Sequence, residues 1–219
     1  MKIALVIIGL IYSSFCLGQD ESSKLKIYSD FINAEIREYD SIFENTTEIV
    51  FLSSVEKFDS SIDLQYLKDY LSGNIENNNF YKEYFDHEPT QYFDLPPTFG
   101  LGKTIKEDAE LGELLVDLIE YKKFNQVDLD MINNVAYGTK IIKKPKRYFK
   151  MGREKFRKKF DNAYGIMMFS DIIFNESKDR AIFYVEQYRG SLDATGDIIV
   201  MQKKSDKWTI ETHINQWMS

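Results

Sequence analysis

The sequence predicts an α+β fold, in which N-terminal helices pack on a C-terminal antiparallel β-meander. Three observations support this prediction. Apolar residues recur every three or four positions in the first half, whereas short apolar runs separated by turn residues follow Gly165. No internal repeat or long linker divides the chain. With 43% hydrophobic and 15% aromatic residues, we expect one packed domain over residues 19–219.

The first 18 residues have the pattern of a secretory signal peptide. Lys2 precedes an uncharged apolar run, and polar residues follow the small Gly18. This run is shorter than the roughly 20 apolar residues that a membrane span needs. We therefore expect a signal peptide over residues 1–18 and export to the periplasm or the exterior, with no transmembrane span in the mature form.

The only cysteine, Cys16, lies inside this segment, so the mature chain cannot form disulfides. A lipoprotein anchored through Cys16 is the alternative, but bulky Phe15 replaces the small residue that lipid attachment favours. The chain has two histidines, His87 and His213. Because neither thiolate nor clustered imidazole is present in the mature chain, we expect no metal and no cofactor.

Three helices and one strand are predicted before the meander. A helix opens the mature chain, a short strand follows at 47–53, and further helices are expected at 62–71 and 104–124. In the last of these, Thr104 and Glu107 form a capping box before a leucine-rich face. Its opposite face is acidic, and is either solvated or directed at a basic partner. The apolar stripe of the first helix consists of Leu25, Tyr28, Ile32, Ile36, Tyr39 and Phe43.

The meander is predicted as four strands, at 166–174, 181–189, 197–203 and 208–217. In the last strand, strict alternation puts an apolar set on one side and a polar set on the other. The cone-shaped arrangement of NTF2-like and cystatin-like folds is one form that such an architecture takes. The apolar set is Trp208, Ile210 and Ile214, and the polar set is Glu211, His213 and Asn215.

Residues 140–159, which we call the basic segment, hold eleven Lys or Arg and a single acid, Glu154. This segment carries +10, while the rest of the chain carries −17. Aromatic residues interleaved with the charges suit phosphate or sulfate groups and lipid headgroups. A solvated face, or a clamp onto the acidic helix, is the alternative, and the acidic net charge argues against nucleic acid as a partner. The candidate anion-binding residues are Lys143, Lys144, Lys146, Arg147, Lys150 and Arg153.

Other chemical candidates are weaker. The run 86–88 (Asp-His-Glu) is expected to be a solvated turn, and the Gly-containing run 100–104 lacks the first glycine of a phosphate-binding loop. His213 is a surface histidine or a general base, depending on what surrounds it. The carboxylates of Asp171, Glu186 and Asp193 are a hydrolytic group only if the fold brings them together. No catalytic residue is therefore assigned.

The C-terminal third resembles an uncharacterised family of exported bacterial proteins over residues 156–219. That family has an FSRVGFN-like strand, an ALVYV-like strand, a glycine-rich connection, a KxGKW-like hairpin and a terminal WIS-like element. Asp171 and Ile173 replace the Arg and Gly of the family pattern. The matching residues here are Phe156 to Phe160, Tyr164-Gly165, Phe169-Ser170, Phe174-Asn175, Ala181 to Tyr188, Gly190, Gly196, Lys204 to Trp208 and Trp217-Met218-Ser219.

This resemblance implies export and a shared fold, but no transferable activity. The function expected from the sequence is that of a non-catalytic envelope or secreted binding domain. Two alternatives stay open: an enzyme with a pocket between meander and helices, using His213 or Asp171 as base, and a binder of anionic polymers or lipid headgroups through the basic segment.

Overall fold

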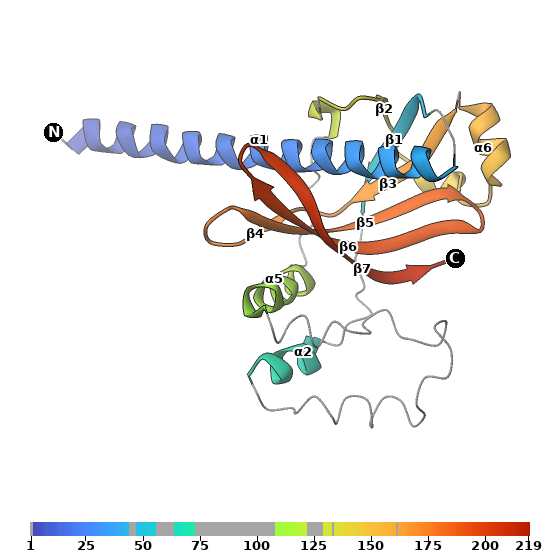
Figure 1. The fold of residues 1–219 in the computed structure, drawn as a ribbon. Helices are drawn as coiled ribbons and strands as arrows, with labels where there is room; N and C mark the ends of the chain where they lie inside the picture. Colours follow the sequence, from blue (N-terminus) through green and yellow to red (C-terminus); the bar gives the residue numbers. More distant parts are fainter. Residues whose placement is uncertain are drawn as a thin grey trace.

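The computed structural model of the protein describes residues 2–43, 47–55, 64–72, 108–121, 129–132, 134–160 and 162–219. Within them the chain forms helices followed by a mostly antiparallel sheet, which confirms the α+β prediction (Figure 1). No helix in these ranges is long and apolar enough to cross a membrane. The helices are α1 (Lys2–Phe43), α2 (Leu64–Leu71), α5 (Ala109–Glu120) and α6 (Arg153–Lys159), with 3-10 turns η2 (Leu129–Met131) and η3 (Pro145–Arg147). The strands are β1 (Ile49–Ser54), β2 (Gly138–Ile141), β3 (Ala163–Phe169), β4 (Ile173–Phe174), β5 (Arg180–Gly190), β6 (Asp193–Lys204) and β7 (Lys207–Met218).

The sheet has the order β2-β1-β3-β5-β6-β7, and β4 pairs with β5 beside β3. The meander from β3 onward is antiparallel, whereas β1 runs parallel to both β2 and β3. The first strand predicted for the meander is divided into β3 and β4. At the break, the Ser170 hydroxyl accepts a hydrogen bond from the backbone N–H of Tyr184 at 2.8 Å. The Ser170 hydroxyl thus takes the place of a backbone carbonyl as the acceptor between β3 and β5, and the chain changes direction at this residue.

Helix α1 covers one face of the sheet with an almost continuous apolar stripe. Tyr28 and Phe31 lie against Phe169 and Phe183 of the sheet; the Phe31 and Phe183 ring centroids are 5.4 Å apart in an edge-to-face arrangement. The predicted stripe is correct at its centre, but Phe43 at its end is 51% exposed. The buried residues of α1 are Ile27, Tyr28, Phe31, Ile32, Ile36 and Tyr39.

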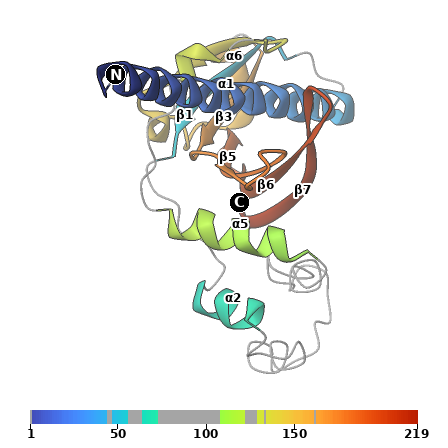
Figure 2. The same cartoon turned by 90° about the vertical axis from the view of Figure 1, so that its left-hand side faces the viewer.

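Helices α5 and α6 cover the opposite face. Figure 2 shows the sheet between α1 and α5, with α2 beyond α5. The leucines predicted on one side of α5 are all buried there, and they pack with sheet residues such as Ile198 and Val200. Asp108 caps this helix by accepting from the backbone N–H of Leu111 at 3.0 Å. The capping residues predicted from sequence, Thr104 and Glu107, lie outside the described residues.

The alternation predicted for the last strand is wrong beyond Ile210. In β7, Ile210 pairs with Met201 but Thr212 pairs with Val200, so Glu211 is an extra residue in the ladder. A bulge of this kind reverses which side the following residues face. Trp208 and Ile210 therefore contribute to the core under α1, whereas Ile214 packs in the core under α5.

Candidate functional site

The basic segment begins in the last two residues of β2, at the edge of the sheet, and continues through the turn η3 to the short helix α6. Figure 1 shows β2 and α6. Of its eleven cationic side chains, nine are exposed, while Arg153 and Arg157 are partly buried. The candidate residues Lys143, Lys144, Lys146, Arg147 and Lys150 are among the exposed ones. The segment therefore presents most of its charge to solvent.

Aromatic side chains attach this segment to the rest of the fold. Phe160 lies against Phe51 of β1 with ring centroids 4.8 Å apart, and buried Phe156 contacts both rings. Phe149 stacks face to face on Tyr188 of β5 at 3.8 Å. Phe156 and Phe160 thus anchor α6 and its C-terminal end to the sheet. Because the backbone is held at several points, the exposed lysines extend from a fixed platform.

The acidic face of α5 makes its ion pairs elsewhere. Glu120 pairs with Lys68 of α2, and Asp108 and Glu110 at the start of α5 pair with Arg180 of β5. The remaining acids of the face, Glu113 and Asp117, are exposed. Where the structure describes α5, its ion pairs are thus with Lys68 and Arg180, both outside the basic segment.

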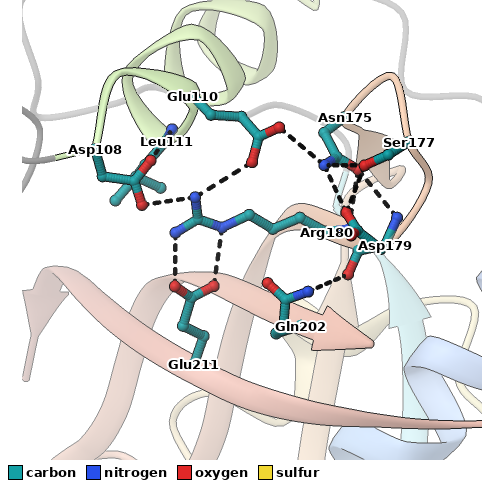
Figure 3. A network of polar contacts seen from close by, with 9 residues as sticks. All are labelled: Asp108, Glu110, Leu111, Asn175, Ser177, Asp179, Arg180, Gln202 and Glu211. Carbon is teal, nitrogen blue, oxygen red and sulfur yellow. Dashed lines mark hydrogen bonds and ion pairs between the residues drawn. The ribbon is translucent and has the colours of Figure 1, made fainter. Parts of the chain in front are cut away.

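Arg180 is the centre of a polar network between α5 and the sheet (Figure 3). Its guanidinium binds Glu211 of β7 through two hydrogen bonds, at 2.9 and 2.7 Å, and contacts Asp108 at 2.6 Å. Burial lowers the pKa of Arg180, but hydrogen bonds and charges from Asp108 and Glu211 more than reverse this, so the net shift is upward. The Arg180 side chain is only 7% exposed. The network joins three elements that are separate in sequence.

The turn before β5 belongs to the same network. Asn175 Oδ1 accepts from the backbone N–H groups of Asp179 and Arg180, and its Nδ2 donates to Glu110 at 3.0 Å. Ser177 and Asn175 donate to the Asp179 carboxylate and lower its pKa. These contacts hold the turn at 175–179 against the start of α5.

Asp171, one candidate for a general base, is buried and fully engaged. Its carboxylate pairs with Lys24 of α1 at 2.7 Å, accepts from the Tyr121 hydroxyl at 3.1 Å and accepts from the backbone N–H of Ile172 at 2.8 Å. Beside it, the buried Tyr28 hydroxyl donates to the Ser170 carbonyl at 2.6 Å. These bonds attach α1 to the break between β3 and β4, which is a structural role.

His213, the other candidate base, is exposed and faces α1 rather than the side of Glu211. It pairs in register with Ile199 of the α1-side core and lies near Glu35. Burial raises the pKa of Glu35, while His213, Gln187 and Arg189 partly oppose that shift. The prediction that His213 shares one side of β7 with Glu211 is wrong because of the bulge.

The three carboxylates grouped from sequence bind three different sets of partners. Asp171 binds Lys24, while Asp193 binds Arg189 at 2.9 Å and approaches Arg153 at 3.8 Å. Glu186 lies on the sheet face that α5 and α6 cover. There its carboxylate accepts weak hydrogen bonds of 3.3 Å from the hydroxyls of Tyr184 and Tyr188. The fold therefore distributes these acids rather than pairing them as a hydrolytic group would require.

Glu186 is surrounded by aromatic residues. Tyr184 and Tyr188 donate to its carboxylate, and the Trp217 indole N–H donates to the Tyr184 hydroxyl at 2.8 Å. Gly196 leaves the space that Trp217 and Tyr184 occupy, since a Cβ there would overlap both. Burial raises the pKa of Glu186, and the two hydrogen bonds and the charge of Lys146 only partly offset it.

We expect Glu186→Gln to gain stability relative to the wild type as the pH rises from about 4 to 7. A folded-state pKa above the unfolded value means that the folded wild type binds more protons in this range, so its stability falls as the carboxyl ionises. The variant has no such proton to lose. Urea unfolding of both proteins at several pH values measures the difference. A difference that is constant with pH, or that changes in the opposite direction, would contradict the raised pKa.

Two sequence candidates, His87 with its acidic neighbours and the run 100–104, lie outside the described residues. Within the described ranges no group of three or more His, Cys, Asp or Glu side chains is placed to hold a metal ion. Sequence reasoning did not identify the buried ion pairs of Arg180 or the buried polar atoms of Tyr39 and Arg157. Arg180 stands at the start of an apolar strand, and a charge in such a position was the available signal that it needs a buried partner.

No protein-family model, curated protein or solved structure matches the chain.

Proposed function

We propose that this protein is an exported, non-catalytic binding domain that attaches to surfaces carrying phosphate or sulfate groups through its basic segment. The observation that carries the proposal is the exposure of nine cationic side chains in 140–159 on a backbone held by aromatic anchors. Export rests on the signal-like residues 1–18.

Two features of the described residues favour binding over catalysis. Asp171 is 3% exposed, and its carboxylate already has an ion pair and two further hydrogen bonds within the fold. His213 is exposed, and its carboxylate neighbour Glu35 lies on α1. By contrast, the exposed lysine side chains already face solvent, so an anionic surface can approach them without a change in the fold. The attraction comes from the summed charge of the side chains and needs no single fixed contact.

We expect the variant in which Lys143, Lys144, Lys146 and Arg147 are all changed to Gln to lose binding to heparin and to vesicles of anionic lipid. Four fewer cations release roughly four fewer counterions, so the dependence of affinity on salt becomes shallower as well. Heparin chromatography and vesicle co-sedimentation at several salt concentrations measure both effects. Retention on heparin but not on vesicles assigns the surface to a polymer, and the reverse assigns it to a membrane.

The matched control removes four exposed lysines from another part of the molecule, as Gln at Lys26, Lys203, Lys204 and Lys207. It has the same net charge as the first variant, and we expect it to keep most of the binding. If the wild type is retained on neither support at low salt, or if the two variants lose binding equally, the proposal is wrong.

A further inference from the structure

A second group of cationic side chains lies where α6, the end of α1 and the connection between β5 and β6 meet. Arg153 and Arg157 are four residues apart on α6, so they lie on the same side of that helix. The Arg153 Cζ is 5.2 Å from the ring centre of Tyr39 and 4.9 Å from that of Phe43. The Arg189 Cζ is 5.4 Å from the Tyr39 ring centre. Two guanidinium groups therefore contact one tyrosine ring.

The acidic side chains that the structure describes at this junction already have partners. Arg189 donates from Nε to Asp193 at 2.9 Å and from Nη1 to the Tyr164 hydroxyl at 2.9 Å. Asp193 also approaches Arg153 at 3.8 Å, so one carboxylate serves two arginines. Glu35 also has partners: it accepts a hydrogen bond from Gln187 and interacts with Arg189.

Two buried polar atoms at this junction have no hydrogen-bond partner. The Tyr39 hydroxyl and the Arg157 Nη1 are both inaccessible to solvent and make no hydrogen bond within the part of the chain that the structure describes. Tyr39 is 6% exposed. The charges of Arg153, Arg189 and Arg157 all act on the Tyr39 hydroxyl, where they oppose the rise in pKa that burial causes. Buried donors are almost always paired in native proteins, so these two require an explanation.

We propose that the junction binds one tetrahedral oxyanion, a phosphate or sulfate group, held by Tyr39, Arg153 and Arg157. The anion accepts hydrogen bonds from the Tyr39 hydroxyl and the Arg157 Nη1, and it supplies the charge that Arg153 lacks while it shares Asp193 with Arg189. Guanidinium groups suit such anions because their N–H groups match the spacing of the oxygen atoms. The site binds one phosphate or sulfate group and requires no polymer or membrane. It is therefore separate from the proposed attachment through the exposed lysines.

The test is titration calorimetry and thermal unfolding of the full-length chain with inorganic phosphate, inorganic sulfate and glycerol phosphate, at an ionic strength held constant with sodium chloride. We expect saturable binding and a higher unfolding temperature than in chloride alone. In Arg157→Gln the dissociation constant should rise about tenfold or more, since a charge-assisted hydrogen bond is lost. Tyr39→Phe, which keeps the ring, should weaken binding to a smaller extent. Lys158→Gln, an exposed neighbour on α6, should bind like the wild type.

No response of the wild type beyond that in chloride would overturn the proposal, as would equal responses of Arg157→Gln and the wild type. A response to glycerol phosphate alone assigns the site to an esterified group, and a response to the inorganic ions as well assigns it to the oxyanion itself; both support the proposal. If Arg157→Gln does not fold in chloride, Tyr39→Phe decides the matter. The fourfold lysine variant should keep its phosphate response, so loss of heparin binding alone affects only the proposed function.

Discussion

Replacing Arg180 by Met is expected to lower the free energy of unfolding by about 3 kcal/mol, because it leaves several carboxylates without their shared cation. Glu211, Asp108 and Glu110 all contact this guanidinium, which is almost inaccessible to solvent (Figure 3). Met keeps the apolar stem of the side chain, so the loss reports on charge rather than on packing. Urea unfolding followed by circular dichroism measures it.

The partners of Arg180 are more exposed than Arg180 itself, with Glu211 at 36% and Asp108 at 31%. For this reason we place the expected loss at the lower end of the range of about 3–5 kcal/mol known for broken buried pairs. Arg180→Lys keeps the charge but not the two-pronged contact with Glu211, and should lose roughly half as much. Lys204→Gln removes an exposed charge from β6 and should change stability by less than about 0.5 kcal/mol. A loss below about 1 kcal/mol in Arg180→Met would show that the network contributes little to stability.

Gly165→Ala is expected to cost about 3 kcal/mol of stability, from backbone strain and steric overlap together. Gly165 has φ +151°, a backbone conformation that residues other than glycine rarely adopt. A Cβ at this position would overlap the carbonyl oxygen of Tyr188 in the neighbouring strand β5. Because that oxygen belongs to backbone of the central sheet, it cannot move without disturbing the pairing of β3 with β5. Thermal and urea unfolding measure the loss.

The same substitution at Gly152 is the control. Gly152 has φ −60°, and a Cβ there would meet no atom within 4 Å. Its place at the start of α6 makes Ala slightly less favourable than Gly, so we expect a change of less than about 1 kcal/mol. Equal losses in Gly152→Ala and Gly165→Ala would refute the steric explanation, since only Gly165 has a close neighbour.

The elements that sequence reasoning predicted correctly are those with a strong local pattern. The stripe of α1 around Tyr28 and Ile36, and the leucine face of α5, each repeat with the period of a helix and are buried as expected. The hairpins of the meander follow from turn residues such as Asn175 and Ser205. Which strands neighbour β1 was not predicted, because a parallel pairing has no connecting turn that the sequence could reveal.

The candidate sites were less predictable than the elements. The bulge at Glu211 reverses the sides of β7 and so separates His213 from Glu211, yet no glycine or proline marks it in the sequence. Asp171 finds its cation at Lys24, which is 147 residues away along the chain. The exposure of Lys143 and its neighbours, by contrast, agrees with what a proline-centred basic run suggests.

By itself, the amino-acid sequence determined the class of fold, the apolar side of each strongly periodic helix and the uneven distribution of charge. Those properties depend on neighbours along the chain, and local periodicity and composition record them directly. Only the tertiary structure decided the partner of each charge: Asp171 with Lys24, Arg180 with Glu211, and the arginines that meet at Tyr39. The physical reason is that electrostatic and hydrogen-bonding energies depend on distances in space, and folding sets these for residues far apart in sequence.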